Sequence, residues 1–132
     1  MRNLMSTLLI TLVGVSAQAQ NKPLACQDDA VGGLNWENRS WATSTFKTEK
    51  FILVQAGNTL TKESVAKVLN TPMPITCNSY KGERISCAAD FQFLLFNIKT
   101  LKGGISHMLG ATTPDGVYKD SVVVQAFSCQ PF

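Results

Sequence analysis

The chain has 132 residues, and its 12 lysine and arginine residues against 9 acidic residues leave a formal net charge of only +3. This near balance of charge, with the lysines scattered along the chain, argues against a nucleic-acid-binding protein. Hydrophobic residues make up 45% of the chain, which is too many for an intrinsically disordered protein.

The first twenty residues predict a secretory signal peptide. Arg2 is followed by an apolar run from Leu8 to Val15 and then by the small-x-small triplet Ala17-Gln18-Ala19. The apolar run is too short to span a bilayer as a helix, and no later stretch predicts a membrane span. We therefore expect residues 1–19 to be removed and residues 20–132 to form one small exported domain, periplasmic or secreted.

Residues 21–40 are rich in glycine, asparagine, aspartate and proline, which predicts an irregular entry segment. Asp28 and Asp29 lie in this segment. We expect them to be solvated turn residues, because no further oxygen ligands follow at the spacing of a calcium-binding loop. We expect core packing for Trp36 and Trp41, although residues of this kind also anchor interfaces.

Residues 41–55 are rich in threonine and aromatic residues, which favours an extended strand that ends in the buried run FILV. The one strong helix signal follows a short turn, at residues 61–70. Thr61 is the expected N-cap, and Asn70 is the expected helix end. Apolar residues at a spacing of three and four share one face of this helix: Val65, Val68 and Leu69. We expect this face to pack against a sheet.

The second half of the chain predicts β-strands. Residues 77–87 hold two short β-rich segments around the turn NSYKGER, which is typical of a hairpin. In residues 91–98, FQFLLFNI, apolar residues occupy both faces. We therefore expect a central strand covered on both sides, or a strand that lines a barrel interior against a helix. Residues 105–111 and 121–129 predict two more strands, joined by a loop around Pro114-Asp115-Gly116.

The four cysteines, Cys26, Cys77, Cys87 and Cys129, predict disulfide bonds. An even number of cysteines in a small exported domain is typical of a disulfide framework. The wide spacing of these cysteines differs from the C-x2-C pairs of zinc sites and of thioredoxin-type redox centres. Four cysteines allow three pairings. We prefer Cys77–Cys87, which closes the predicted hairpin, with Cys26–Cys129, which ties the start of the domain to its end.

Sequential strands joined by short turns pair antiparallel as a rule. The order of the predicted elements therefore indicates an α+β fold. It consists of a bent antiparallel β-sheet or partial β-barrel of about five to seven strands, with one short helix at about 61–70 packed on it. Because a domain of this size has a limited core, we expect the disulfides to contribute much of its stability.

No residue pattern in the sequence supports catalysis. His107 is the only side chain with an unperturbed pKa near neutrality, and we expect it to be a surface or half-buried strand residue. Its neighbour Ser106 would point to the opposite face of a strand, so the two cannot form a nucleophile–base pair. Asp115 and Asp120 are interpreted as solvated loop residues. We therefore expect no enzyme activity, no cofactor and no metal site.

Loop tips that combine tyrosine with lysine or arginine form the candidate recognition surface, because such residues are enriched where proteins touch partners. The candidates are Tyr80, Lys81, Arg84, Tyr118 and Lys119. The leading hypothesis is an exported protein that docks on an unknown protein partner, for example as an inhibitor or protective factor. The alternatives are a partial barrel that binds a small apolar ligand or lipid, and a hydrolase with an unrecognised site.

Overall fold

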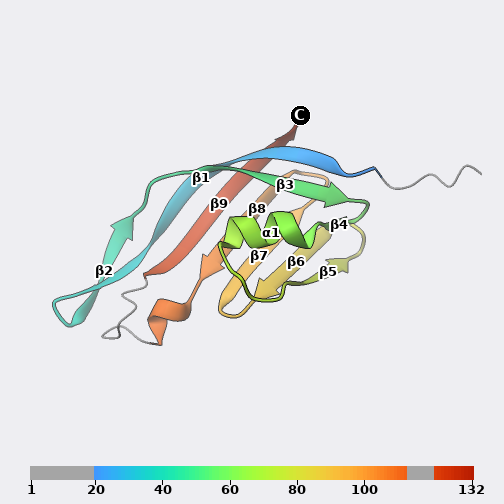
Figure 1. Ribbon diagram of the computed structural model, residues 1–132. Coiled ribbons are helices and arrows are strands. Elements are labelled where there is room, and N and C mark those ends of the chain that lie inside the picture. Colours follow the sequence, from blue (N-terminus) through green and yellow to red (C-terminus); the bar gives the residue numbers. More distant parts are fainter. Residues whose placement is uncertain (1–19, 113–120) are drawn as a thin grey trace, which may run out of the picture.

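The computed structural model describes residues 20–112 and 121–132, and within these ranges nine β-strands form one antiparallel sheet with a single short α-helix (Figure 1). The elements are β1 (Lys22–Glu37), β2 (Ser40–Thr45), β3 (Lys50–Ala56), β4 (Thr59–Leu60), α1 (Lys62–Leu69), β5 (Thr76–Tyr80), β6 (Arg84–Ala89), β7 (Gln92–Asn97), β8 (Lys102–His107) and β9 (Val122–Pro131), with a short 3-10 turn at Leu109–Ala111. Along the sheet the order is β4-β3-β1-β9-β8-β7-β6-β5, and β2 also pairs with β1. The sheet curls until its outer strands β4 and β5 approach each other, so it is a nearly closed barrel.

The strands β1, β2 and β3 form one long two-stranded ribbon. β2 pairs with residues 32–37 of β1, and β3 pairs with residues 22–27, in one unbroken register. Between these two stretches the backbone N–H of Asp28 donates to the carbonyl oxygen of Glu49 at 3.0 Å, in that same register. The ribbon is therefore one structural unit, although β2 and β3 are separate strands.

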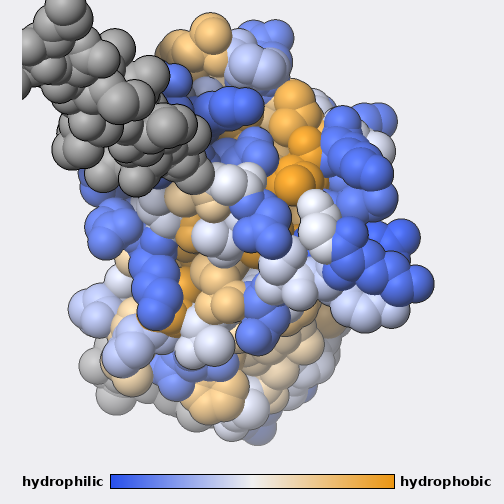
Figure 2. Space-filling model, turned by 90° about the vertical axis from the view of Figure 1, so that its right-hand side faces the viewer, coloured by the Kyte–Doolittle hydropathy of each residue, from blue (hydrophilic) through white to orange (hydrophobic). Residues whose placement is uncertain are grey.

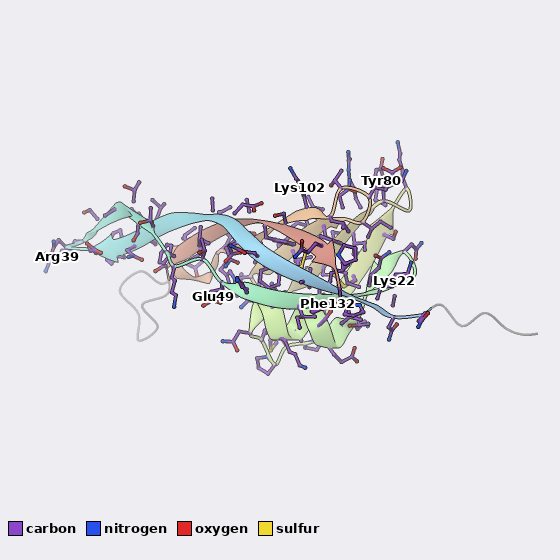
Figure 3. The ribbon with its side chains drawn as sticks, turned by 90° about the horizontal axis from the view of Figure 1, so that it is seen from above. Lys22, Arg39, Glu49, Tyr80, Lys102 and Phe132 are labelled. Carbon is purple, nitrogen blue, oxygen red and sulfur yellow. A yellow bond between two sulfur atoms is a disulfide. The ribbon has the colours of Figure 1, made fainter. Side chains whose placement is uncertain are left out.

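The β1–β2 hairpin extends beyond the rest of the sheet. The last β1 residue that pairs with β9 is Leu34, opposite Val122, whereas β1 and β2 stay paired up to the turn at Asn38 and Arg39. Both turn residues have a positive φ, 50° and 63°, as in the two-residue turns whose twist matches that of the flanking strands. We call residues 35–42 the arm. Figure 3 shows the arm projecting from the body of the molecule, with Arg39 at its tip.

The core lies between the inner face of the sheet and α1. Val65 and Leu69 of the helix are completely buried. On the sheet, the rings of Phe96 and Phe127 stack with their centroids 6.0 Å apart, and the ring of Phe51 meets Phe127 edge-on at 5.1 Å. The other buried apolar side chains of this cluster include Leu24, Leu53, Leu60, Ile85, Leu94 and Ile105. Aromatic and aliphatic side chains thus fill the space that the curled sheet encloses.

Both disulfides join residues that lie directly opposite each other on neighbouring strands. Cys26 of β1 pairs with Cys129 of β9, and Cys77 of β5 pairs with Cys87 of β6. The preferred pairing is confirmed, and no cysteine is free. The first bond holds the beginning and the end of the described chain together at the centre of the sheet.

The predicted helix is confirmed. It covers Lys62–Leu69, with extended backbone at the N-cap Thr61 and a left-handed conformation at Asn70, as expected for a helix end. The predicted β5–β6 hairpin and the strands within 91–98 and 121–129 are also confirmed.

The predicted number of strands is too low, because the supposed irregular entry segment is the longest strand, β1. The aspartate and glycine residues that suggested a loop have structural roles within this strand. The register between β1 and β9 shifts between Asp28 and Ala30, so Asp29 is the extra residue of a β-bulge. At Gly33 a Cβ atom would lie 1.9 Å from the carbonyl oxygen of Val122, so only glycine allows this close approach of the two strands.

Candidate functional site

The β5–β6 turn brings three of the predicted recognition residues together: Tyr80, Lys81 and Arg84. They line a shallow depression of about 200 Å³ at the tip of the hairpin. The Nζ atom of Lys81 lies 5.4 Å from the centre of the Tyr80 ring, within the range of a cation–π contact. Tyr118 and Lys119 lie outside the described residues, so the two predicted loops are not placed relative to each other.

An ion pair fixes this turn to the adjacent β7–β8 turn. The Nζ atom of Lys99 donates a hydrogen bond to Oε1 of Glu83, and the backbone N–H of Ile98 donates to the Glu83 carbonyl oxygen at 2.9 Å. The hydrogen bond and the charge of Lys99 lower the pKa of the Glu83 carboxyl group below its ordinary value of 4.5. The β5–β6 tip is therefore attached to its neighbouring turn through Glu83.

The arm carries both tryptophans, and they are not part of the core. Trp36 and Trp41 lie opposite each other on β1 and β2, and their rings meet edge-on with centroids 5.2 Å apart. Trp41 is 37% exposed, and neither residue belongs to the core cluster, so the expectation of core packing is wrong. The hairpin is too far from α1 and the inner face of the sheet to contribute to the core. In Figure 3 the arm tip at Arg39 and the predicted recognition residue Tyr80 lie at opposite ends of the molecule.

Hydrogen bonds at the base of the arm attach it to the sheet. The Nδ2 atom of Asn35 donates to Oγ of Ser44 on β2 at 3.2 Å. The hydroxyl group of Ser121, which precedes β9, donates to Oδ1 of Asn35. One asparagine side chain therefore connects both strands of the arm to β9.

Asp28 is buried at the β-bulge, which contradicts the expectation of a solvated turn residue. Its side chain is 3% exposed. Oδ2 accepts a hydrogen bond from the backbone N–H of Glu49 at 2.9 Å, whereas Oδ1 has no hydrogen-bond partner among the described residues. Burial raises the pKa of the Asp28 carboxyl group above 3.8, the Glu49 hydrogen bond opposes this, and the charges of Glu49 and Asp29 add to it. Asp29 itself is exposed, as expected.

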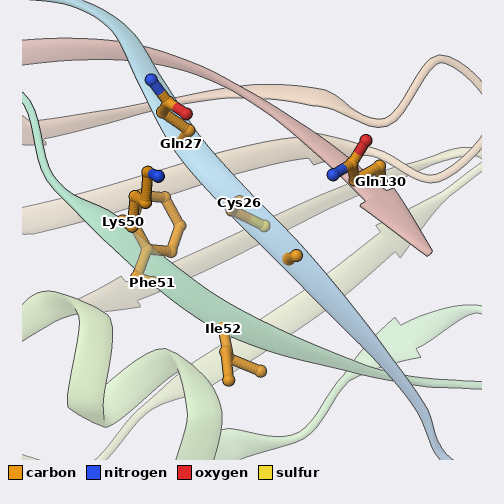
Figure 4. Close-up of a pocket in the computed structure, with 7 residues that line it drawn as sticks. Cys26, Gln27, Lys50, Phe51, Ile52 and Gln130 are labelled. Carbon is orange, nitrogen blue, oxygen red and sulfur yellow. The ribbon is translucent and has the colours of Figure 1, made fainter. Parts of the chain in front are cut away.

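Two surface depressions flank β3 and share its first three residues. One lies on the outer face of the sheet, has a volume of about 420 Å³, and is also lined by Ala25, Cys26, Gln27 and Gln130 (Figure 4). The other is a groove of about 510 Å³ between β3 and α1. Both are bordered by Lys50, Phe51 and Ile52, and Ile52 is 52% exposed. The run FILV was expected to be buried, so the sequence pattern did not point to β3 as a site; the exposure of Ile52 shows that this expectation is wrong.

The outer face of β7 is uncovered, so of the two expectations for this strand, coverage on both sides is wrong, whereas its inner face lines the interior of the curled sheet beside α1. Leu94 and Phe96 point into the core, whereas Phe93 and Leu95 are exposed. Together with Val124 of β9 they border a shallow apolar depression of about 210 Å³. The alternation along the strand was predicted correctly, but α1 covers only the inner face.

The sequence-based expectation for His107 is confirmed. It is half-buried on β8, opposite Gln92 of β7 and Val123 of β9, and Ser106 points to the other face of the sheet. Among the described residues no group of three or more histidine, cysteine, aspartate and glutamate side chains is placed to hold a metal ion. Asp115 and Asp120 lie outside the described residues.

The surface mixes polar and apolar residues. Seen from the right-hand side of Figure 1, hydrophilic side chains alternate with small apolar patches (Figure 2). Within residues 20–112 and 121–132, no helix has the length and the apolar character needed to cross a bilayer. Comparison with protein-family models, curated proteins and solved structures found no match to this chain.

Proposed function

We propose that this protein is an exported binding protein that docks on a protein partner, as an inhibitor or protective factor, and that the arm is its main contact element. The observation that carries the proposal is the Trp36–Trp41 pair, which lies outside the core on a hairpin that extends past β9. Tryptophan is enriched among the residues that dominate the energy of protein interfaces.

The rigidity of the arm supports this role. A two-stranded ribbon without further support is only marginally stable in water. Here the two indole rings meet edge-on, and Asn35 joins the base of the arm to Ser44 and Ser121. A contact element that is ordered before binding loses less conformational entropy in the complex.

The residues of the arm indicate which groups a complementary partner surface would contain. Glu37, Asn38 and Arg39 are exposed at the tip, directly beyond the two indole rings. A partner would therefore offer a cleft with apolar walls for the rings and polar groups, including a carboxylate for Arg39, at its deep end. Such a cleft is typical of the substrate-binding sites of hydrolases, which makes an inhibitor the preferred form of the proposal.

Two further observations support an exported binding protein. Both disulfides are of the structural kind that persists in oxidising compartments, in line with the predicted leader at residues 1–19. The close packing of Phe96, Phe127 and Leu53 inside the sheet favours a docking protein over a barrel that carries an apolar ligand.

A site-specific photo-cross-linking experiment tests the proposal. A photoreactive phenylalanine derivative is placed at the exposed position Glu37 on the arm or, as the matched control, at the exposed position Lys81 on the opposite tip. Each variant is irradiated in an envelope extract from the source cells. We expect a discrete adduct from position 37 that disappears when Trp41→Ala is added, and no such adduct from position 81.

An adduct from position 81 alone would move the docking surface to the β5–β6 turn and overturn the role of the arm. If neither position gives an adduct at any extract concentration, the docking function itself is contradicted.

A further inference from the structure

The outer edge of β3 exposes part of its backbone to the groove beside α1. Along one edge β3 pairs with β1, from Lys50 to Gln55. Along its other edge, the outer one, it pairs only with β4, and that pairing covers only Gln55 and Ala56. The first residues of β3 therefore have no strand on their outer side.

The hydrogen bonds of Val54, farther along β3, show which backbone groups face this edge. The N–H of Val54 donates to Oγ of Ser64 at 3.1 Å, and its carbonyl oxygen accepts from the N–H of Thr61 at 2.8 Å. Both groups of Val54 therefore point away from β1. Glu49, in contrast, accepts a hydrogen bond from Asp28 on β1.

Backbone direction alternates along a strand, so every second residue presents its N–H and C=O to the same side. The N–H and C=O groups of Val54 point away from β1, and those of Glu49 point toward it. The N–H and C=O groups of Ile52 and Lys50 therefore also point away from β1. Pro23, which lies opposite Val54, has no N–H to offer to this pair, and this agrees with the assignment. Two donors and two acceptors of β3 thus face the groove at Lys50 and Ile52.

The helix α1 forms the other wall of the groove. It begins beside Val54 and runs back along β3 toward the start of that strand (Figure 1). Apolar groups of Phe51, Ile52, Val54 and Val68 line the groove. The lining charges are separated along it: Glu63 lies near the start of the helix, while Lys67 on its last turn and Lys50 at the start of β3 lie toward the other end.

We propose that this groove binds an extended segment of a partner protein, which adds to β3 as an antiparallel strand and places an acidic side chain beside Lys50 and Lys67. The open row of backbone groups matches an extended peptide, because another strand can pair with them in sequence. The bound segment would continue the ladder that β4 begins and that ends at Val54. Its apolar side chains would lie against Ile52 and Val68.

The position of α1 selects a single extended chain as the occupant. The helix lies along the edge, so a flat sheet edge from a second copy of this protein would meet the helix before it reached Ile52. A single strand occupies only about 5 Å beside its neighbour. The groove is separate from the arm, so this inference does not depend on the proposed function.

Peptide selection tests the proposal without knowledge of the natural partner. Short random peptides displayed on phage are selected on the immobilised protein. Each selected sequence is then synthesised with blocked termini, and its affinity is measured on the wild type and on Ile52→Pro. Proline at this position removes the N–H that faces the groove, and an edge strand tolerates proline where that N–H is unpaired. Ile52→Val is the matched control, because it retains the N–H and a β-branched side chain.

We expect the selection to yield peptides that combine β-branched residues with aspartate or glutamate. Ile52→Pro should weaken their binding about tenfold, in keeping with the loss of one backbone hydrogen bond, and Ile52→Val should not. The double variant Lys50→Glu/Lys67→Glu should also lose binding, whereas Lys62→Glu, on the same helix but outside the groove lining, should retain it. The Ile52 amide proton should exchange quickly in the free protein and slowly in the complex.

If Ile52→Pro unfolds, peptides methylated at alternate backbone nitrogens replace it, since they remove the reciprocal hydrogen bonds of the same ladder, those from peptide N–H groups to the carbonyl oxygens of Lys50 and Ile52. The proposal is overturned if no peptide is selected, if the selected peptides bind Ile52→Pro as well as the wild type, or if they are basic. Trp41→Ala should leave peptide binding unchanged, which separates failure of the groove from failure of the arm.

Discussion

Two hydrogen bonds join Asp28 of β1 to Glu49, which lies in the segment between β2 and β3. The backbone N–H of Asp28 donates to the carbonyl oxygen of Glu49 at 3.0 Å, and the N–H of Glu49 donates to Oδ2 of Asp28 at 2.9 Å. The side-chain carboxylate thus takes the place that a backbone carbonyl would have in a regular ladder. This exchange lets the ribbon keep its register beside the bulge at Asp29.

The buried carboxylate makes stability depend on pH. The folded-state pKa of Asp28 lies above 3.8, chiefly because burial removes the carboxylate from water. The folded protein then binds this proton more tightly than the unfolded chain does. The contribution of Asp28 to the free energy of unfolding therefore rises as the pH falls through the folded-state pKa, and it is complete below 3.8.

Asp28→Asn should remove this dependence. The free energy of unfolding of the variant minus that of the wild type should be larger at neutral pH than near pH 4, as measured by urea unfolding at both values. Asp29→Asn removes one of the smaller causes that raise the pKa of Asp28, so it should change the stability in the same direction but by less. Asp28→Ala should cost about 1–3 kcal/mol near pH 4, because the Glu49 N–H loses its acceptor, and less at neutral pH, where the wild type carries the buried charge. A constant difference between wild type and Asp28→Asn would contradict the account.

The two disulfides should contribute unequally to stability. Cys26–Cys129 joins residues 103 positions apart, and Cys77–Cys87 joins residues 10 apart. The loop-entropy relation assigns about 4.7 kcal/mol to a closure of about 100 residues and about 3 kcal/mol to a short one. In urea unfolding, the double variant Cys26→Ala/Cys129→Ala should therefore lose more free energy than Cys77→Ala/Cys87→Ala. The reverse order would show that unfolded-chain entropy is not the main contribution of these bonds.

The adjacent glycines of β1 should respond differently to the same substitution. At Gly33 a Cβ atom would meet the Val122 carbonyl oxygen at 1.9 Å, whereas at Gly32 its nearest neighbour would be the Ser44 carbonyl oxygen at 3.8 Å. Gly33→Ala should force β1 and β9 apart and lower the melting temperature strongly, with overpacking of this kind costing about 1–3 kcal/mol or more. Gly32→Ala should change it little. Equal melting temperatures for the two variants would mean that the strands can separate there without loss.

The Glu83–Lys99 pair should be visible in a titration of the Glu83 carboxyl group. Lys99 lowers its pKa below 4.5 through a hydrogen bond and through its charge. A carboxyl group with a lowered folded-state pKa stabilises the protein above its unfolded-state pKa and loses this contribution as the pH falls. NMR titration should show the pKa of Glu83 rising toward its ordinary value in Lys99→Met. Because both side chains are exposed, Lys99→Met should hardly alter the melting temperature.

The indole pair should matter little for folding. Trp41 makes its aromatic contact with Trp36 on the arm, outside the core cluster, and such a ring pair contributes about 0.5–1.5 kcal/mol. Trp41→Ala should therefore lower the free energy of unfolding far less than Phe127→Ala, for which a loss of about 3–5 kcal/mol is expected. Urea unfolding of the two variants provides the comparison. A loss as large as that of Phe127→Ala would place the arm in the folding core and weaken its proposed role in docking.

Local signals in the sequence predicted a substantial part of the fold. The spacing of Val65 and Leu69, with Thr61 and Asn70 at the ends, determined α1, because a helix is built from contacts between residues close in the chain. The same holds for the β5–β6 hairpin, whose short turn brings Cys77 opposite Cys87. The candidate residues Tyr80, Lys81 and Arg84 were placed together for this local reason.

Tertiary structure alone decided the rest. Whether Asp28 is buried, whether Trp36 and Trp41 enter the core, and which face of β7 stays open depend on where β9 ends and on which side of the sheet α1 lies. The edge of β3 is open because the chain, after pairing as β4, leaves this edge at Thr61, opposite Val54, and enters the helix. Strand pairing and burial are set by contacts between residues far apart in the chain, and a local pattern carries no information about where those distant partners stop.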